Sequence, residues 1–258
     1  MNRRVFLLGL LAAGCTTGTP SGELTIAAGE RGGMYFDFAT LLAEQLVDVR
    51  GRALETEGSL ANLALLASGA AQVALTLADS ARVADPALEL RALGRVYENY
   101  LQLVVREDDP ARVPADLAGR TVSLGAEGSG ASLSGERMLV ALGLRSSVRV
   151  EHFKLSDAAQ ALVERRVDAL LWSGGVPTPT LSGVPGIRLL PLAELVAPLR
   201  AAYDSVYEQV AVPVDVYGAT REVPTIGQVG QHPGHVGTSR RKKGRGRTSE
   251  PLVATEYS

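Results

Sequence analysis

Hydrophobic positions along the chain change their spacing in a fixed order, first as in a strand and then as in a helix. A short apolar stretch at residues 24–28 predicts a strand, and a glycine-rich turn follows it at residues 29–33. Residues 34–49 then carry apolar side chains at helical spacing, which predicts a helix with one buried face. A second apolar helix is predicted to begin at Ser59, which suits an N-cap, and to end at Gly69.

An alternating strand at residues 72–77 completes this unit, and the same order of elements then returns. Gly29 and Gly125 open the two glycine-rich turns and lie 96 positions apart, whereas the capping residues Ser59 and Ser156 lie 97 apart. The second unit begins with a strand at residues 121–124, and a glycine turn with its helix follows at 125–142. A capped helix at 156–163 and a strand at 167–172 complete it. Since βα units resemble one another, chance agreement is the alternative. The matching landmarks favour two similar α/β lobes that face a shared cleft.

Composition narrows the chemistry that these lobes can carry. The 258 residues hold 26 basic and 28 acidic side chains and are 46% hydrophobic, which excludes a wholly disordered chain. One cysteine excludes a disulfide framework or a thiolate metal cluster, and three histidines argue against a histidine-rich metal site. Aromatic residues make up only 5%, so stacking on single-stranded nucleic acid is not expected. We therefore expect no metal, no cofactor and no nucleic-acid partner.

The first fifteen residues have the features of an export signal. Arg3 and Arg4 precede an apolar run at residues 5–11, and small residues then lead to Cys15. The run is shorter than the ~20 residues that a membrane-spanning helix needs. Small residues before a cysteine resemble a bacterial lipobox, so we expect a signal peptide with lipidation at Cys15, an ordinary thiol being the alternative. Residues 16–22 then form a flexible tether that holds the protein outside the cytoplasm on a membrane.

The two glycine-rich turns stand before helix starts, where unpaired N–H groups attract anions. Glycines there let the backbone approach a ligand closely, so residues 32–33 and 128–130 are two candidate anion seats. The hydroxyl and amide groups near these seats belong to Ser59, Ser129, Ser132 and Asn62. Each of these residues also fits a structural role, for example Ser59 and Asn62 as helix caps.

Nucleotide-binding and catalytic motifs are missing from these turns. Residues 125–130 contain no lysine placed as in a phosphate-binding loop, and neither turn has the Gly-x-Gly-x-x-Gly order with an acidic partner. The Gly-Ser-Gly sequence around Ser129 lacks the frame of a hydrolase nucleophile, and His152 has no evident partner. We therefore assign no catalytic residue and expect a binding protein rather than an enzyme.

Several short motifs recur in the order known from one family of receptors. Residues 32–35 read Gly-Gly-Met-Tyr, a Gly-Gly-x-Tyr helix start, and residues 58–63 read Gly-Ser-Leu-Ala-Asn-Leu, a Gly-Ser-x-x-Asn-Leu turn. Further characteristic segments lie at residues 101–106, 114–126, 128–131 and 223–227. Between residues 24 and 227 the chain thus resembles the solute receptors of tripartite ATP-independent periplasmic (TRAP) transporters, specifically the TAXI family.

The resemblance implies a two-lobed α/β fold of the periplasmic-binding-protein type II class. Such a receptor closes on a small carboxylate, here a glutamate-like amino acid or an organic acid, and delivers it as a monomer to a TRAP membrane permease. The ligand contacts carried over from the motifs are Gly33, Tyr35, Ser59, Asn62, Asp79, Gly128, Ser129 and Gly130. The chain departs from the family pattern in two places: Glu30 and Arg31 replace a small polar pair before the glycines, and Ala131 replaces a frequent threonine, which removes one hydroxyl.

The residues and the family resemblance together give the expected segments. They are a signal peptide at 1–15, a tether at 16–22, a first lobe at 23–105, a second lobe at 106–212, a return toward the first lobe at 213–227 and a tail at 228–258. The tail holds six basic and two acidic residues, a charge of +4 against −6 for the rest of the chain. We expect it to be disordered, or to meet anionic lipid, in place of the family's C-terminal segment, which is apparently truncated.

Two other functions fit the same sequence. One is an enzyme on the same bilobal fold, such as a deaminase or a transferase, because a fold does not fix a function. The other is an exported interaction lipoprotein without a small ligand. The paired helix starts and the motif order favour the solute receptor over both.

Overall fold

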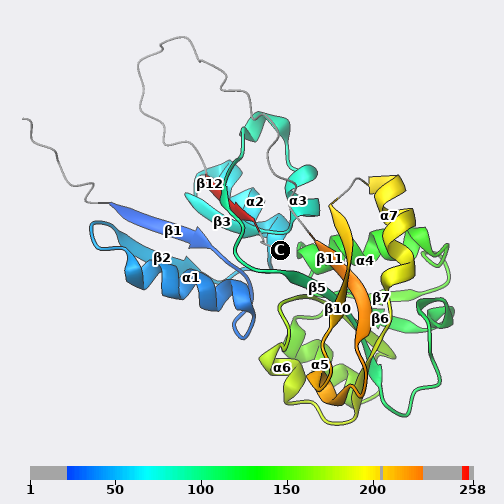
Figure 1. The fold of residues 1–258 in the computed structure, drawn as a ribbon. Coiled ribbons are helices and arrows are strands. Elements are labelled where there is room, and N and C mark those ends of the chain that lie inside the picture. Colours follow the sequence, from blue (N-terminus) through cyan, green and yellow to red (C-terminus); the bar gives the residue numbers. More distant parts are fainter. Residues whose placement is uncertain (1–21, 204–205, 229–251, 256–258) are drawn as a thin grey trace, which may run out of the picture.

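The strands of the protein form two separate sheets, each with its own helices. The computed structural model describes residues 22–203, 206–228 and 252–255, so the predicted signal peptide, the lipidation site and most of the tether lie outside the described residues (Figure 1). The first sheet has the strand order β2-β1-β3-β12-β4, and with its helices it makes the first lobe. Its strands are β1 (Glu23–Ala27), β2 (Arg50–Leu54), β3 (Val73–Thr76), β4 (Arg91–Gly94) and β12 (Leu252–Thr255). Its helices are α1 (Met34–Gln45), α2 (Ser59–Ser68), α3 (Ala78–Arg82) and the short 3₁₀ helix η1 (Pro86–Leu88).

The second lobe is built on a seven-stranded sheet of order β10-β11-β5-β8-β6-β7, with β9 also paired to β5. Its strands are β5 (Asn99–Arg106), β6 (Thr121–Ser123), β7 (Arg149–Glu151), β8 (Ala169–Gly174), β9 (Ile187–Leu190), β10 (Tyr207–Val212) and β11 (Val223–Gln228). Its helices are α4 (Gly130–Ala141), α5 (Leu155–Val163), α6 (Pro179–Ser182) and α7 (Val196–Tyr203), with 3₁₀ helices η2 (Pro114–Leu117), η3 (Ala193–Leu195) and η4 (Val216–Gly218). None of the helices in the described part of the chain combines the length and the apolarity needed to cross a membrane.

The internal duplication predicted from the sequence is confirmed by the strand order. In the first lobe β1 pairs in parallel with β2 and β3, and in the second lobe β6 pairs in parallel with β7 and β8. The helices α1 and α4 begin at Met34 and Gly130, 96 positions apart, and α2 and α5 begin at Ser59 and Leu155, also 96 apart. Each lobe therefore contains the same three-stranded unit with a helix start at equivalent positions.

Alternating side chains of the strands explain why each sheet is covered on both faces. In the first lobe Ile26 packs in a cluster with α1 residues, whereas its neighbour Ala27 packs with Leu63 and Leu66 of α2. Successive strand residues point to opposite faces, so a continuous apolar stretch requires a helix on each side. The second lobe has the same arrangement, with one apolar cluster under α4 and α7 and another under α5.

Three segments lie in different sheets from those expected. The strand β5, expected to close the first lobe, is central in the second sheet, because Leu101, Leu103 and Val105 are fully buried in its core. The strand β11 pairs with β10 and β5 rather than returning to the first lobe. Within the tail that we expected to be disordered, β12 pairs in parallel with both β3 and β4. The rest of the tail beyond Gln228 lies outside the described residues.

The buried amide of Asn62 joins four segments of the first lobe. Its Oδ1 accepts a hydrogen bond from the Thr56 hydroxyl at 2.6 Å, and its Nδ2 donates to the carbonyl of Leu75 at 2.7 Å and to that of Ala28. The side chain is completely buried, and these partners follow β1, precede α2 or belong to β3. Asn62 therefore fixes the start of α2 against the sheet.

Replacing Asn62 by Ala should lower the free energy of unfolding by about 2–4 kcal/mol, because it removes three buried hydrogen bonds. Urea denaturation followed by circular dichroism measures this loss. Gln160→Ala is the matched control, because that amide is exposed and bonds only Glu164 on its own helix, so its effect should stay within about 0.5 kcal/mol. Equal stability of the two variants would contradict the structural role of Asn62.

Candidate functional site

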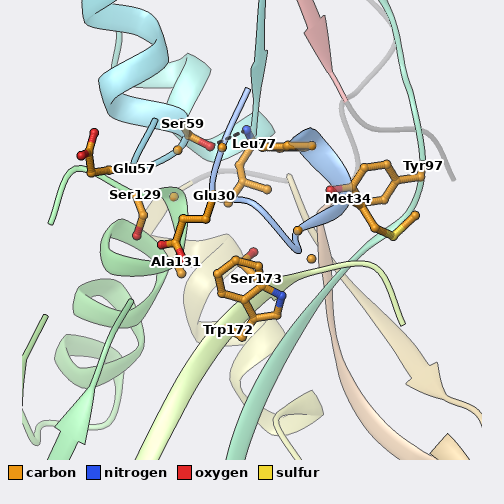
Figure 2. A pocket seen from close by; sticks show the side chains of 16 residues that line it. Glu30, Met34, Glu57, Ser59, Leu77, Tyr97, Ser129, Ala131, Trp172 and Ser173 are labelled. Atoms are coloured by element: carbon orange, nitrogen blue, oxygen red, sulfur yellow. Dashed lines mark hydrogen bonds between the residues drawn. The ribbon is translucent and has the colours of Figure 1, made fainter. Parts of the chain in front are cut away.

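A small cavity lies between the lobes, at the starts of α1, α2 and α4. Its volume is about 40 Å³. Both lobes contribute to its walls, as Figure 2 shows. The lining residues are Gly29, Glu30, Gly33, Met34, Tyr35, Glu57, Gly58, Ser59, Leu77 and Tyr97 from the first lobe and the segment between the lobes, and Ser129, Gly130, Ala131, Trp172, Ser173 and Gly174 from the second.

The glycine turn of the first lobe forms the wall nearest to Trp172. A Cβ added at Gly33 would lie 3.2 Å from the carbonyl oxygen of Glu30 and 3.4 Å from the Trp172 ring, so the turn needs glycine to lie this close. The N–H of Gly33 donates to that same carbonyl oxygen at 3.1 Å. We expected an anion seat at residues 32–33, but this hydrogen bond directs the Gly33 N–H into the turn instead of the cavity.

The start of α4 forms the opposite wall and retains unpaired donors. Ser129 is the N-cap, and its hydroxyl oxygen accepts a hydrogen bond from the N–H of Ser132 at 3.0 Å. The N–H groups of Gly130 and Ala131 find no acceptor among the described residues, and both residues line the cavity. Since a helix N-terminus carries partial positive charge, this wall suits a carboxylate or another small anion.

The start of α2, by contrast, is occupied by the second lobe. The N–H groups of Leu60 and Ala61 both donate to the carbonyl oxygen of Gly128, at 3.0 and 3.1 Å. Ser59 is the first residue of α2 and not its cap, because the cap is Gly58. The Ser59 hydroxyl accepts a hydrogen bond from the N–H of Leu77 at 3.0 Å. The α2 start is therefore a contact between the lobes rather than a ligand seat.

Glu30 brings a buried carboxylate to the cavity. Its side chain is only 7% exposed, and its Oε2 accepts a hydrogen bond at 2.8 Å from the N–H of Leu155, the first residue of α5. Its Oε1 is buried and has no hydrogen-bond partner among the described residues. Burial raises the pKa of Glu30, while the hydrogen bond from Leu155 and the charge of Lys154 lower it less. We expected Ser156 to cap this helix. Instead, the carboxylate of Glu30 from the first lobe accepts the N–H at the start of α5.

Aromatic rings complete the cavity. Tyr35 and Tyr97 lie with ring centroids 5.8 Å apart and planes tilted by 59°, and Trp172 of β8 also lines the cavity (Figure 2). Sequence reasoning identified Tyr35 through its motif but missed Trp172, Tyr97 and Glu30. The signals were present, since Trp172 is the only tryptophan and stands before a Ser-Gly-Gly turn, and Glu30 departs from the family pattern.

The eight predicted ligand contacts separate into two groups. Those that line the cavity are Gly33, Tyr35, Ser59, Ser129 and Gly130, whereas Asn62, Asp79 and Gly128 do not. Asn62 holds the first lobe together, and Gly128 contributes a carbonyl to the contact between the lobes. In the described part of the chain, no group of three or more His, Cys, Asp and Glu side chains is arranged to hold a metal ion.

Comparisons with known proteins agree with this geometry. The sequence pattern of the NMT1-like family matches residues 26–232. The chain belongs to this family. The structure of this NMT1-like protein is similar to that of an ancestral arginine-binding protein bound to arginine, with 20% identity and a TM-score of 0.51 over 66% of this chain and 78% of the other. It is also similar to the substrate binding protein of an amino acid ABC transporter, with 14% identity and a TM-score of 0.50 over 80% and 85% of the two chains. The fold is therefore the two-lobed fold of periplasmic binding proteins, as the sequence predicts.

A polar network behind the cavity joins the lobes of the NMT1-like protein. Asp79 of α3 is completely buried, and its Oδ2 accepts hydrogen bonds from the hydroxyls of Ser134 at 2.8 Å and Tyr207 at 2.9 Å. Arg137 lies 3.5 Å from the same oxygen and donates to the Tyr207 hydroxyl at 2.9 Å. Gln228 accepts from the Asp79 N–H and donates to Ser134. Asp79 thus contacts the second lobe rather than the cavity.

Proposed function

We propose that the chain is an extracytoplasmic solute-binding receptor that captures a small carboxylate between its two lobes. The observation that supports this most directly is the pair of unpaired N–H groups of Gly130 and Ala131 at the wall of an interlobe cavity. A carboxylate accepts two hydrogen bonds there and benefits from the positive end of α4. Membership of the NMT1-like family and the fold shared with periplasmic binding proteins support the same function.

The cavity volume implies that the lobes move apart to admit a solute. About 40 Å³ is far below the ~300–1,000 Å³ of ordinary ligand pockets. The contacts between the lobes that oppose this movement include the hydrogen bonds from Leu60 and Ala61 to Gly128, the one from Leu155 to Glu30, and the polar network around Asp79. The described chain passes between the sheets at residues 95–98, which places a hinge there.

The lining side chains support binding rather than catalysis. None of the cavity residues in the described chain is a histidine, lysine or cysteine, the side chains that most often serve as base or nucleophile. The hydroxyls of Ser59 and Ser129 accept hydrogen bonds from backbone N–H groups. We therefore infer that the protein is a receptor and not an enzyme.

We further propose that the receptor serves a TRAP-type membrane permease. The motif order from residues 32–35 to 223–227 supports this assignment, because it resembles the TAXI receptors of such transporters. The export signal and Cys15 place the mature protein at a membrane surface through a lipid anchor, where a permease can receive the solute.

Calorimetric titration with amino acids and dicarboxylic acids should reveal binding, and Gly130→Val should weaken it at least ~100-fold. A Cβ at Gly130 would lie 2.3 Å from Cδ1 of Leu77 and 2.7 Å from the Ser59 hydroxyl, so the lobes of the variant cannot close. Gly183→Val is the matched control, because this residue does not line the cavity and a Cβ there meets its nearest atom at 3.6 Å. The receptor proposal would be contradicted if Gly130→Val bound with full affinity, or if no solute bound the unmutated protein.

Uptake measurements test the type of transporter. Solute uptake that depends on this protein should continue in cells depleted of ATP while an ion gradient is maintained, and it should stop when the gradient is collapsed. A TRAP permease is ATP-independent, whereas an ABC transporter hydrolyses ATP for each cycle. Uptake lost on ATP depletion with the gradient intact would assign the receptor to an ABC transporter instead.

Cys15→Ser should release the protein from membranes into the soluble extracytoplasmic fraction without unfolding it, because only the lipid anchor is lost. Fractionation and immunoblotting measure this shift, and the melting temperature of the soluble variant checks its fold. Ser21→Ala in the tether is the control and should stay at the membrane. Unchanged membrane attachment of Cys15→Ser would show that the anchor lies elsewhere.

A further inference from the structure

The cavity has an asymmetric charge distribution. The start of α4 offers N–H groups and partial positive charge, and the buried carboxylate of Glu30 lies close by, whereas the exposed side chain of Glu57 points away from the cavity (Figure 2). The described residues that line the cavity include no lysine, arginine or histidine. A simple carboxylate bound at α4 would therefore meet the like charge of Glu30 with no basic side chain in the cavity wall to balance it.

The two carboxylate oxygens of Glu30 differ in their hydrogen bonding, and one of them has no donor in the described part of the chain. Its Oε2 is held by the N–H of Leu155, so the carboxylate cannot rotate freely. Its Oε1 is buried without a donor among the described residues, although the side chain is 93% buried and lines the cavity. A buried charged acceptor without a donor is unfavourable, and a bound N–H group at this position would satisfy it.

Aromatic side chains in the cavity wall also favour a positively charged ligand group. Trp172, Tyr35 and Tyr97 line the cavity together with Glu30, and aromatic rings attract cations over their faces. Figure 2 shows Glu30 between Trp172 and the start of α4, with Ser129 and Ala131 beside it. The position next to Glu30 therefore suits a cation, and the position next to Gly130 and Ala131 suits an anion.

We propose that the solute is a zwitterion, an α-amino acid with an uncharged side chain, whose ammonium group donates to Oε1 of Glu30 while its carboxylate accepts from the N–H groups of Gly130 and Ala131. This inference rests on the proposed function and narrows its solute class. A second carboxylate, as in glutamate or a dicarboxylic acid, would add to the repulsion from Glu30. The ligand therefore needs a nitrogen with N–H groups and no net negative charge.

The test compares ligands that differ only in the ammonium group. Calorimetry at pH 7.5 uses L-alanine against propionate and L-leucine against 4-methylpentanoate, so that two side-chain sizes are covered, with succinate and L-glutamate as doubly negative solutes. The parent protein should bind at least one amino acid of these pairs more than ~10-fold tighter than its nitrogen-free partner. It should bind that amino acid more tightly than succinate and L-glutamate as well.

Glu30→Gln separates ligand recognition from the contact between the lobes. Its Oε1 can still accept from the N–H of Leu155, but a neutral amide replaces the carboxylate whose other oxygen is buried without a partner among the described residues. Amino-acid affinity should fall at least ~10-fold, and binding of the nitrogen-free carboxylates should stay equal or rise. Glu55→Gln is the matched control, because this exposed carboxylate pairs with Arg31 outside the cavity, and it should change neither affinity.

The pH dependence gives a second readout of the same site. Burial raises the pKa of Glu30, and the charged groups that face it are Lys154 and Asp157 of the α5 region and Glu57 of its own lobe. As pH falls through this raised pKa the carboxylate becomes neutral, so amino-acid affinity of the parent should decrease, and Glu30→Gln should lack this decrease.

The outcomes distinguish this inference from the proposed function. Nitrogen-free carboxylates or dicarboxylates that bind as tightly as the amino acids, with no effect of Glu30→Gln, would overturn the zwitterion and leave the carboxylate receptor standing. If none of these solutes binds the parent protein, both proposals fall. If Glu30→Gln bound amino acids as tightly as the unmutated protein, Glu30 would only connect the lobes and its role in ligand recognition would be wrong.

Discussion

Buried polar contacts hold the lobes in their closed arrangement, and the carboxylate of Asp79, which is completely buried, lies in the largest group of them. This side chain comes from the first lobe, whereas the hydroxyls of Ser134 and Tyr207 and the guanidinium of Arg137 that satisfy it come from the second. A buried carboxylate without these donors would be strongly unfavourable, so the lobes must meet with α3 against α4. That alignment in turn sets the start of α4 against Ser59 and Leu77, where the cavity lies.

In each of the two duplicated units, the start of one helix is bound by an acceptor from the other lobe. The helix α2 has its first N–H groups bound by the Gly128 carbonyl of the second lobe, and its equivalent α5 has its first N–H bound by Glu30 of the first lobe. Each lobe thus completes a helix start of its partner, which removes two of the anion sites that such a fold otherwise offers. The start of α4 keeps the unpaired N–H groups of Gly130 and Ala131, and this difference leaves hydrogen-bond donors on that side of the cavity.

Local sequence patterns predict the elements well because periodicity and glycine position act within one unit. The strand–turn–helix order and the equivalence of the two lobes follow from them, as the starts at Met34 and Gly130 show. The assignment of β5 and β12 to their sheets could not be predicted, since strand pairing over long distances leaves no local signal. The same limit applies to the site, where Glu30 and Asp79 owe their roles to partners more than 50 residues away. Motifs identified Ser129 and Gly130 correctly as cavity residues but could not tell that Asn62 faces the core.

The position of β12 has a consequence for the order in which the protein folds. Every strand of the second sheet comes from the continuous stretch between Asn99 and Gln228, so this sheet can form from neighbouring segments. Among the described strands β4 pairs only with β12, and β3 meets β12 across about 180 residues of sequence. Closing so long a loop costs entropy before any contact compensates it, which slows the pairing. The second lobe is therefore the natural folding nucleus, and the first lobe completes its sheet last, against a partner that is already formed.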